Sequence, residues 1–259
     1  MVSLPNEVIN WEEEMEPRGK TDTGRRQFLC GCCATLTSVG LGPSFAAAAT
    51  DPVAVPVESA PFHFQVFEND YVRFLNVLIP PGKVGAYHRH SIDFAFVIVE
   101  ATDRLEVTVL DKPMGLASLK TGQVVFTGYS KAPLVHQVAN AGQRSFHVMG
   151  IEILDSQPGR FSPSTRSDVP AYASVLDNER VRGWRLMLQP NESAAAIVQT
   201  VPGVRIVVQG GDTVETTPEK PDHELNLNRG DFVWQAAGTT RAVRNVGTSP
   251  VEWVEFELK

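Results

Sequence analysis

The stretch VFENDYVRFLNVLIPPG, residues 66–82, decides the fold because it recurs as VLDNERVRGWRLMLQPN, residues 175–191. Each copy contains a valine, a short acidic turn with an asparagine, a Val-Arg pair, an apolar strand and a proline-containing turn. Shorter matches follow in the same order: GQVVFT (122–127) with GDFVWQ (230–235), HQVANAG (136–142) with RAVRNVG (241–247), and SFHVMGIEIL (145–154) with PVEWVEFEL (250–258). Self-similarity that keeps its order indicates a duplicated domain.

Both copies consist of short segments rich in β-branched and aromatic residues, bounded by Gly, Pro, Asn and Asp, such as DFAFVIVE (93–100) and RLEVTVL (104–110). Such segments predict an all-β barrel or sandwich. The 259 residues, 42% hydrophobic and 20% charged, are typical of a globular protein. We expect two tandem β-barrels, residues 50–155 and 172–259, joined by a polar Pro/Ser/Gly-rich linker at 156–171.

The charge distribution argues against nucleic acid as a partner. The formal net charge is -7, and Lys and Arg form no stripe that could neutralise a row of phosphates. We expect a small-molecule substrate or ligand, no nucleic acid and no membrane contact beyond an export signal. A homodimer is possible.

Residues 1–49 resemble a twin-arginine export signal. RRQFL (25–29) is followed by an uncharged Gly/Ala/Leu-rich segment and a run of alanines, and cleavage is expected after Ala48 or Ala49. A retained N-terminal anchor and a Sec signal are the alternatives. The three cysteines lie within CGCC (30–33), inside this signal, so the mature chain would have no thiolate ligand. The resemblance implies a periplasmic or extracytoplasmic protein.

The stretch GKVGAYHRHSID (82–93) places His88 and His90 one residue apart. On a β-strand, residues i and i+2 point to the same face about 6.6 to 6.8 Å apart. Both imidazoles could therefore bind one ion, with bonds of about 2.0 to 2.1 Å for zinc. A lone His-x-His is weak evidence, because two surface histidines would give the same pattern.

The surrounding residues resemble the two motifs of the cupin family. Gly82 stands before the His88-x-His90 pair, and a second segment runs from a glycine through a proline-containing turn to His136-x-x-x-Asn140. The resemblance implies that both halves are jelly-roll-like cupin barrels and that His88, His90 and His136 share one divalent metal inside the first. It implies a structural role for Asn140 at a turn.

The acidic position departs from the cupin pattern. Where most metal-binding cupins have a glutamate, this sequence has Phe94, and Asp93 stands one place earlier. A slip of one residue on a strand turns a side chain to the opposite face. Asp93 is therefore a candidate fourth ligand only if the preceding turn is one residue shorter, and otherwise an exposed turn residue. The metal, Fe, Mn, Ni or Zn, is left open.

The remaining histidines, His63, His147 and His223, are interpreted as structural or exposed, with His147 the one expected to approach the cavity. In the second copy, the positions of His88 and His90 fall near Val198 and Thr200, and that of His136 is Arg241. An arginine cannot bind a metal, although it can hold a carboxylate; an exposed strand arginine is the alternative. The second barrel is predicted to be a scaffold or dimerisation partner.

The resemblance favours a mononuclear metal-dependent bicupin, an oxygenase acting on a small anionic, phenolic or thiol substrate. Apolar residues expected around the metal are Phe94, Phe96, Val125 and Phe126. Alternatives are a non-catalytic metal- or small-molecule-binding protein and a metal-dependent sugar isomerase or epimerase. No serine-hydrolase elbow, phosphate-binding loop or His-Glu-x-x-His motif occurs, and no catalytic residue is assigned.

Overall fold

The computed structural model describes residues 54–154 and 162–259, and all of these belong to one compact unit. The predicted export signal, residues 1–49, lies outside the described residues. Among the described residues, no helix is long and apolar enough to cross a membrane.

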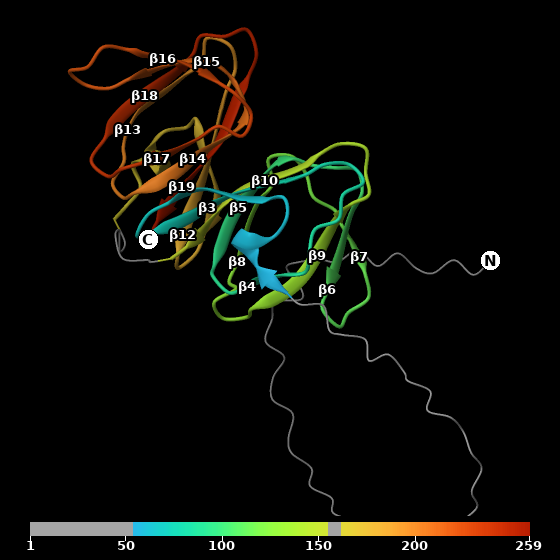
Figure 1. Ribbon diagram of the computed structural model, residues 1–259. Coiled ribbons are helices and arrows are strands. Elements are labelled where there is room, and N and C mark those ends of the chain that lie inside the picture. The colour runs from blue at the N-terminus through green and yellow to red at the C-terminus, as the bar shows by residue number, and fades with distance from the viewer. Residues whose placement is uncertain (1–53, 155–161) are drawn as a thin grey trace, which may run out of the picture. The chain divides into compact units, whose positions relative to one another are not determined.

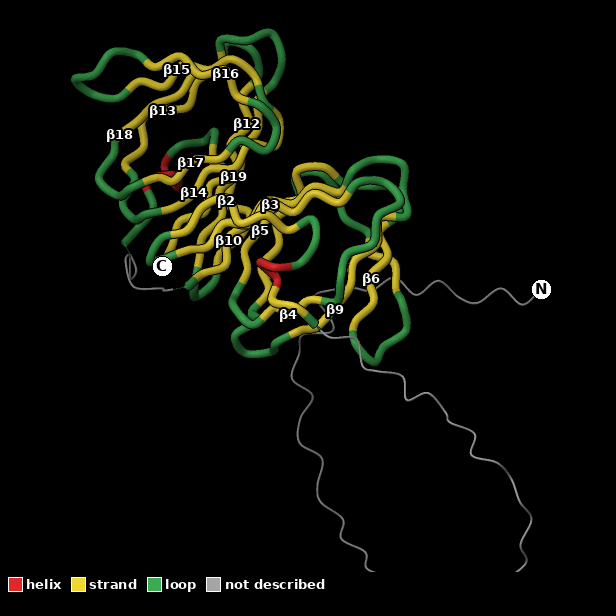
Figure 2. Tube along the Cα trace, viewed as in Figure 1, coloured by secondary structure: helices red, strands yellow, loops and turns green. Residues whose placement is uncertain are grey.

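Each repeat folds as a jelly-roll-like pair of sheets (Figures 1 and 2). In the N-terminal barrel, one sheet has the order β1 (Val55–Pro56), β4 (His88–His90), β9 (Leu134–Asn140), β6 (Leu105–Val109) and β7 (Gly115–Ala117). The other has the order β2 (His63–Glu68), β3 (Val72–Ile79), β10 (Phe146–Ile153), β5 (Phe94–Glu100) and β8 (Val124–Thr127). The short 3-10 helix η1 (Val57–Ser59) follows β1.

The C-terminal barrel repeats this plan. One sheet has the order β11 (Tyr172–Asp177), β12 (Val181–Leu188), β19 (Val251–Leu258), β14 (Gly203–Gln209) and β17 (Phe232–Gln235). The other has the order β13 (Ser193–Val198), β18 (Thr240–Asn245), β15 (Gly211–Thr216) and β16 (His223–Leu227). A 3-10 helix, η2 (Thr165–Asp168), precedes β11 and lies within the stretch expected as a linker. The predicted all-β fold with two repeated barrels is confirmed.

Strand register makes the two barrels comparable residue by residue. β3 pairs with β10 from Val72 opposite Ile153, and β12 pairs with β19 from Val181 opposite Leu258. In β4 and β9, His88 lies opposite His136, and Ile197 of β13 lies opposite Arg241 of β18. Arg241 therefore occupies the position of His136, as the sequence alignment predicted.

The predicted counterparts of His88 and His90 were wrong by one residue. Register places Ile197 and Gln199 there, in place of Val198 and Thr200. Both barrels have the same one-residue shift before these positions, since Val84 lies opposite Ala139 and Ser193 lies opposite Arg244. Continuing the alignment of residues 66–82 with 175–191 without a gap therefore gives Ile197 and Gln199, and a displacement of one residue along the strand would place the opposite face inward.

Outward-facing residues of the sheets that contain β10 and β19 form a single hydrophobic core shared by both barrels. Phe74 stacks on Phe232 in this core, with ring centroids 4.3 Å apart. Phe126, which was expected beside the metal, packs here instead, because it lies on the opposite face of β8 from Val125.

The turns before β4 and β13 each need a left-handed residue. Gly82 has φ +70°, and the matching Asn191 has φ +67°. Each donates its backbone N–H to an asparagine carbonyl, Gly82 to Asn140 at 2.8 Å and Asn191 to Asn245 at 3.0 Å. Glycine and asparagine are the residues that tolerate this conformation best.

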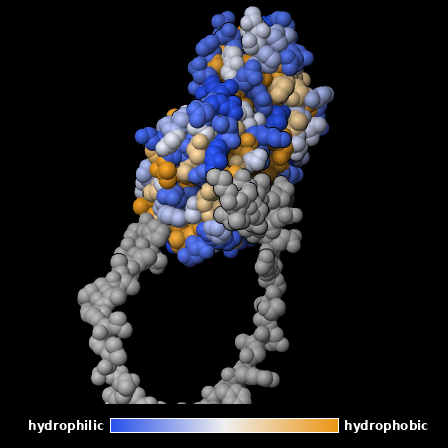
Figure 3. Space-filling model, turned by 90° about the vertical axis from the view of Figure 1, so that its right-hand side faces the viewer, coloured by the Kyte–Doolittle hydropathy of each residue, from blue (hydrophilic) through white to orange (hydrophobic). Residues whose placement is uncertain are grey.

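The face of the molecule in Figure 3 shows hydrophobic side chains in small groups among hydrophilic ones. The large hydrophobic residues that are exposed, among them Phe64 and Val84, belong to different strands and turns. We assign no partner to this surface, and the homodimer stays a prediction.

Candidate metal centre

Three histidines converge inside the N-terminal barrel. The alternation of β4 turns His88 and His90 inward, and the antiparallel pairing with β9 brings His136 opposite His88. All three are buried, and one nitrogen of each lies within 4.8 Å of the others. The Nε2 atoms of His88 and His136 are 2.9 Å apart. The structure thus brings together the three histidines that the sequence placed in two separate motifs.

The hydrogen bonds of these histidines fit a metal site. The Nδ1 of His88 lies 3.0 Å from the carbonyl oxygen of Ala86, which can only accept, so Nδ1 carries the proton and the lone pair is on Nε2, which faces Nε2 of His136. The Nδ1 atoms of His90 and His136 are buried, and no described residue is hydrogen-bonded to them. Buried polar atoms without partners are rare in native proteins, and a bound ion is one accepted explanation.

Burial also keeps the imidazoles neutral. Desolvation, followed by the neighbouring His63, lowers the pKa of His88 to about 4. Desolvation, with His88 and His63 adding to it, lowers the pKa of His136 to about 3. The same causes hold the pKa of His90 well below its usual range. Neutral imidazole is the form that binds metals, so at neutral pH no proton competes with an ion here.

Aromatic rings surround the histidines. Tyr129 stacks on His90 with ring centroids 4.6 Å apart, and Phe94 lies 5.9 Å from His90 and stacks on Phe96. Burial raises the pKa of Tyr129 to about 12, so its hydroxyl stays protonated. The predictions for Phe94 and Phe96 therefore hold, while Tyr129 was missed. This environment excludes water from one side of the centre.

The structure does not bring Asp93 into the histidine group. Its Oδ1 accepts a hydrogen bond from the backbone N–H of Ser130 at 2.9 Å, and its Oδ2 lies 3.3 Å from Nε of Arg180. Asp93 is buried, so it is not the exposed turn residue that was the alternative. Its carboxylate instead links the turn after β4 to Arg180 in the second barrel.

His63, which was interpreted from the sequence as structural or exposed, is a fourth buried histidine and lies beside the other three. It lies on β2 opposite Val77, and its ring centroid is 4.5 Å from that of His88. It does not belong to the group whose nitrogens are mutually within 4.8 Å. Extending the repeat alignment upstream would have signalled it, because His63 stands at the position of the buried Tyr172.

The other two histidines lie elsewhere. The Nε2 of His147 is 2.9 Å from Oδ1 of Asn76, and its ring is close to Gly230 in the second barrel. His147 shares a face of β10 with Met149, which belongs to the shared core, so it does not approach the cavity as predicted. His223 is exposed at the start of β16, as expected.

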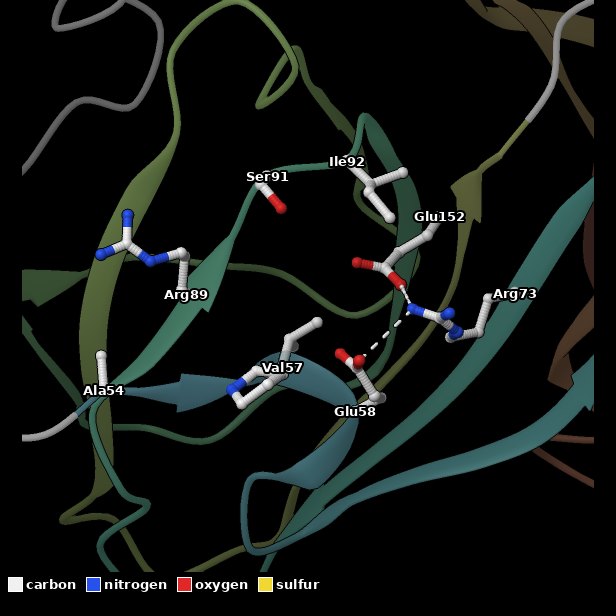
Figure 4. Close-up of a pocket in the computed structure, with 9 residues that line it drawn as sticks. Ala54, Val57, Glu58, Arg73, Arg89, Ser91, Ile92 and Glu152 are labelled. Carbon is white, nitrogen blue, oxygen red and sulfur yellow. Dashed lines mark hydrogen bonds and ion pairs between the residues drawn. The ribbon is translucent and has the colours of Figure 1, made fainter.

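A cavity of about 230 Å³ lies beside β4 (Figure 4). In it, Nη1 of Arg73 lies 3.0 Å from the buried Glu152 and 3.7 Å from Glu58. None of the three converging histidines lines this cavity; its lining residues are Ala54, Pro56, Val57, Glu58, Arg73, Arg89, Ser91, Ile92 and Glu152. The segment just after the predicted cleavage site thus builds part of the barrel wall.

The C-terminal barrel holds charged groups where the N-terminal barrel holds histidines. Gln199 accepts hydrogen bonds from Arg166 at 2.6 Å and from Arg241 at 3.1 Å. Arg166 is completely buried and also pairs with Glu255 and Glu257. Arg241 is buried and pairs with Glu255 at 2.9 Å, so the exposed-arginine alternative is wrong.

Solved structures share this arrangement of two barrels. AerE from Microcystis aeruginosa matches with a TM-score of 0.53 and 13% identity, over 80% of this chain and 98% of that chain. A salicylate 1,2-dioxygenase variant from Pseudoaminobacter salicylatoxidans, in complex with gentisate, matches with a TM-score of 0.50 and 11% identity, over 73% and 69%. Oxalate decarboxylase from Bacillus subtilis at pH 4.6 matches with a TM-score of 0.50 and 10% identity, over 73% and 68%.

No protein-family model matches the chain, and no curated protein matches it either. At the identities of the solved structures, the likeness concerns the fold alone. The chain has the two-barrel cupin fold, with a buried group of three histidines in its N-terminal barrel.

Proposed function

We propose that the N-terminal barrel binds one divalent metal ion through His88, His90 and His136 and acts as a mononuclear metal enzyme, an oxygenase of a small anionic or phenolic substrate. The observation that carries the proposal is the convergence of three buried, neutral imidazoles, in which Nε2 of His88 is the unprotonated nitrogen and faces Nε2 of His136. Such a donor set suits Fe, Mn, Ni or Zn.

The charge of the site supports an anionic substrate. Three imidazoles contribute no negative charge, and the carboxylate of Asp93 is engaged by Ser130 and Arg180. A bound divalent ion would keep its full charge in a low-dielectric interior, where an anionic ligand is strongly favoured. The salicylate 1,2-dioxygenase of similar fold was solved with gentisate, an aromatic acid, which agrees with this substrate class.

The chain's own residues would bind the metal ion, orient the histidines that hold it and shield it from water. When bound, the metal would supply Lewis acidity or one-electron chemistry. Ala86 holds His88 in the tautomer that offers Nε2, and the rings of Tyr129 and Phe94 exclude water beside His90. Tyr129 keeps a protonated hydroxyl at neutral pH. The three imidazoles already face one another inside the barrel, which favours preorganised binding.

A second candidate function is a non-catalytic metal-binding protein. The observation in its favour is that the 230 Å³ cavity is lined by none of the three histidines. A metal sealed in the barrel would then stabilise the fold without meeting a substrate.

Metal analysis of the purified protein tests the proposal. We expect one equivalent of metal in wild type and none in His88→Ala or His136→Ala, with His223→Ala, an exposed histidine in the other barrel, as the matched control that keeps it. Oxygen consumption with a panel of small aromatic acids, phenols and thiols then separates an oxygenase from a binding protein. Wild-type protein loaded with Fe, Mn, Ni and Zn in turn that retains none of them would contradict the metal site.

We also propose export to the periplasm or another extracytoplasmic compartment through the signal in residues 1–49. Replacing Arg25 and Arg26 by lysine should leave the protein in the cytoplasmic fraction. Unchanged export of that variant would contradict a twin-arginine route.

A further inference from the structure

His63 stands at a position that no motif assigns, and it rests against the proposed metal centre. Its side chain is buried at 8% exposure, and its ring lies 4.5 Å from the ring of His88 at an angle of 57°. It comes from β2, in the opposite sheet from β4 and β9. The imidazole therefore approaches the three histidines from a different wall of the barrel.

The hydrogen bond of His63 determines which nitrogen is free. Its Nδ1 lies 3.0 Å from the carbonyl oxygen of Pro61, and a carbonyl can only accept, so Nδ1 is the donor. The Nε2 atom then carries a lone pair, and no described residue is hydrogen-bonded to it. Unlike Nδ1 of His90 and His136, this nitrogen is not among the fully buried atoms that lack a partner, so part of its surface is accessible to a small molecule such as water.

The second barrel shows what a side chain at this position touches. The counterpart of His63 is Tyr172, since they lie opposite the equivalent residues Val77 and Leu186. The ring of Tyr172 lies 5.5 Å from the guanidinium carbon of Arg166. That guanidinium is bound by Gln199, the counterpart of His90, so it fills the place that the metal centre has in the first barrel. In the second barrel this position therefore faces the guanidinium of Arg166, and in the first barrel it faces the histidine group.

We infer that His63 binds the exogenous ligand of the metal centre, its Nε2 accepting a hydrogen bond from a hydroxyl or a water in the open coordination position. This rests on the proposed function, and it narrows the substrate class to acids that carry a hydroxyl beside the metal-binding carboxylate. The carboxylate of such a ligand would bind the metal ion, and its hydroxyl would donate a hydrogen bond to Nε2 of His63. A plain carboxylate would leave the lone pair of His63 facing an anion, which is unfavourable.

The test compares glycolate with acetate as probes, titrated into the Co(II)-loaded full-length protein and followed by visible absorption. His63→Leu removes the acceptor, and His63→Gln keeps one in its amide oxygen. We expect His63→Leu to reduce the preference for glycolate over acetate about five- to tenfold, the value of one hydrogen bond. His63→Gln should retain most of the preference, and His147→Leu, which removes a histidine outside the centre, should retain all of it.

Separate outcomes distinguish the two proposals. If wild type binds no Co(II), or if His88→Ala still binds it, the metal centre itself is contradicted. If Co(II) binds and His63→Leu keeps the wild-type preference, the role of His63 is overturned while the centre stands. Loss of Co(II) from folded His63→Gln and His63→Leu would also overturn it, because His63 would then be a metal ligand.

Discussion

The two barrels have the same frame and opposite interiors. Where the N-terminal barrel has His88, His90 and His136, the C-terminal barrel has Ile197, Gln199 and Arg241. Val57 of η1 corresponds to Arg166 of η2, since each accepts the same turn hydrogen bond, from Ala60 and from Val169. One interior contains a group of three neutral histidines, and the other contains the guanidinium groups of Arg166 and Arg241.

The two barrels also differ in the size of the side chains at matching interior positions. A Cβ at Gly150 would lie 2.5 Å from Cβ of Phe96 and 2.8 Å from the ring of Phe94, so that position must stay small. Its counterpart is Glu255, and the counterpart of Phe94 is Gly203. Large and small residues have thus changed places across the same pair of strands, which keeps both barrels filled at native density.

The buried carboxylates of the C-terminal barrel are neutralised by buried arginines. Burial disfavours the charge of Glu255, but Arg166, Arg241 and Arg205 outweigh burial and hold its pKa below its usual range. Trp184 donates its indole N–H to Glu257 at 2.9 Å. A buried ion network of this kind is costly to break at any single member, because the remaining partner is left charged and dry. The comparison shows that the second barrel has an internal ion network at the positions where the first barrel has its histidine group.

The largest effect is expected from Arg166→Ala. It should lower the free energy of unfolding by about 3 to 5 kcal/mol, because Glu255 and Glu257 lose their partner inside the barrel. Val57→Ala, at the matching position of the other barrel, should cost about 2 kcal/mol. Urea unfolding measures both. Equal losses of unfolding free energy at the two positions would contradict the view that a buried ion network stabilises one barrel and apolar packing the other.

The next largest loss of stability is expected at a buried asparagine that both barrels have, Asn140 in the first and Asn245 in the second. Nδ2 of Asn140 donates to the carbonyls of Ile79 and Arg144, both at 2.8 Å, and Nδ2 of Asn245 donates to two equivalent carbonyls at 3.0 and 2.9 Å. Asn140→Ala and Asn245→Ala should each cost about 2 to 3 kcal/mol, since buried carbonyls lose their donors. Thermal or urea unfolding checks this. A large cost in only one variant would show that the frames are not equivalent.

Acid should affect the N-terminal barrel first. The pKa of His88 falls from 6.5 to about 4 on folding and that of His136 from 6.5 to about 3, so the unfolded chain binds more protons in this range. The stability of metal-free protein should therefore decrease as the pH falls from about 6.5 to about 4. Urea unfolding across this range measures the slope.

The combined variant His88→Leu with His136→Leu is the control for this slope. It removes two of the titrating groups and should flatten the decrease. A slope unchanged by the two substitutions would place the acid sensitivity elsewhere in the chain.

The smallest effect is expected from Asp93→Asn. It removes the ion pair with Arg180 but keeps an oxygen for the backbone N–H of Ser130, so it should cost about 1 kcal/mol. It should leave the metal content unchanged, as Arg180→Gln should. Loss of metal in Asp93→Asn alone would make Asp93 a fourth ligand and bring the site closer to the three-histidine, one-carboxylate type.

The candidate site was readable from the sequence as far as local spacing reaches. His88 and His90 are two apart on a strand, and His136 with Asn140 has its own motif, so these residues could be assigned from periodicity and resemblance. Arg241 could be aligned with His136 because both precede the same Asn-containing turn. His63 has no motif and could be found only by extending the repeat alignment upstream to Tyr172, and Tyr129 could not be found, since it reaches the centre from a turn without a motif.

By itself, the sequence determined the duplicated all-β fold and the three histidines that converge in one barrel, because alternation and repetition are local properties of the chain. Only the tertiary structure decided which side chains share an interior. The fold stacks Tyr129 on His90, and it places the carboxylate of Asp93 beside Ser130 and Arg180, outside the histidine group. Both depend on contacts between residues distant in the chain, and local spacing does not encode those contacts.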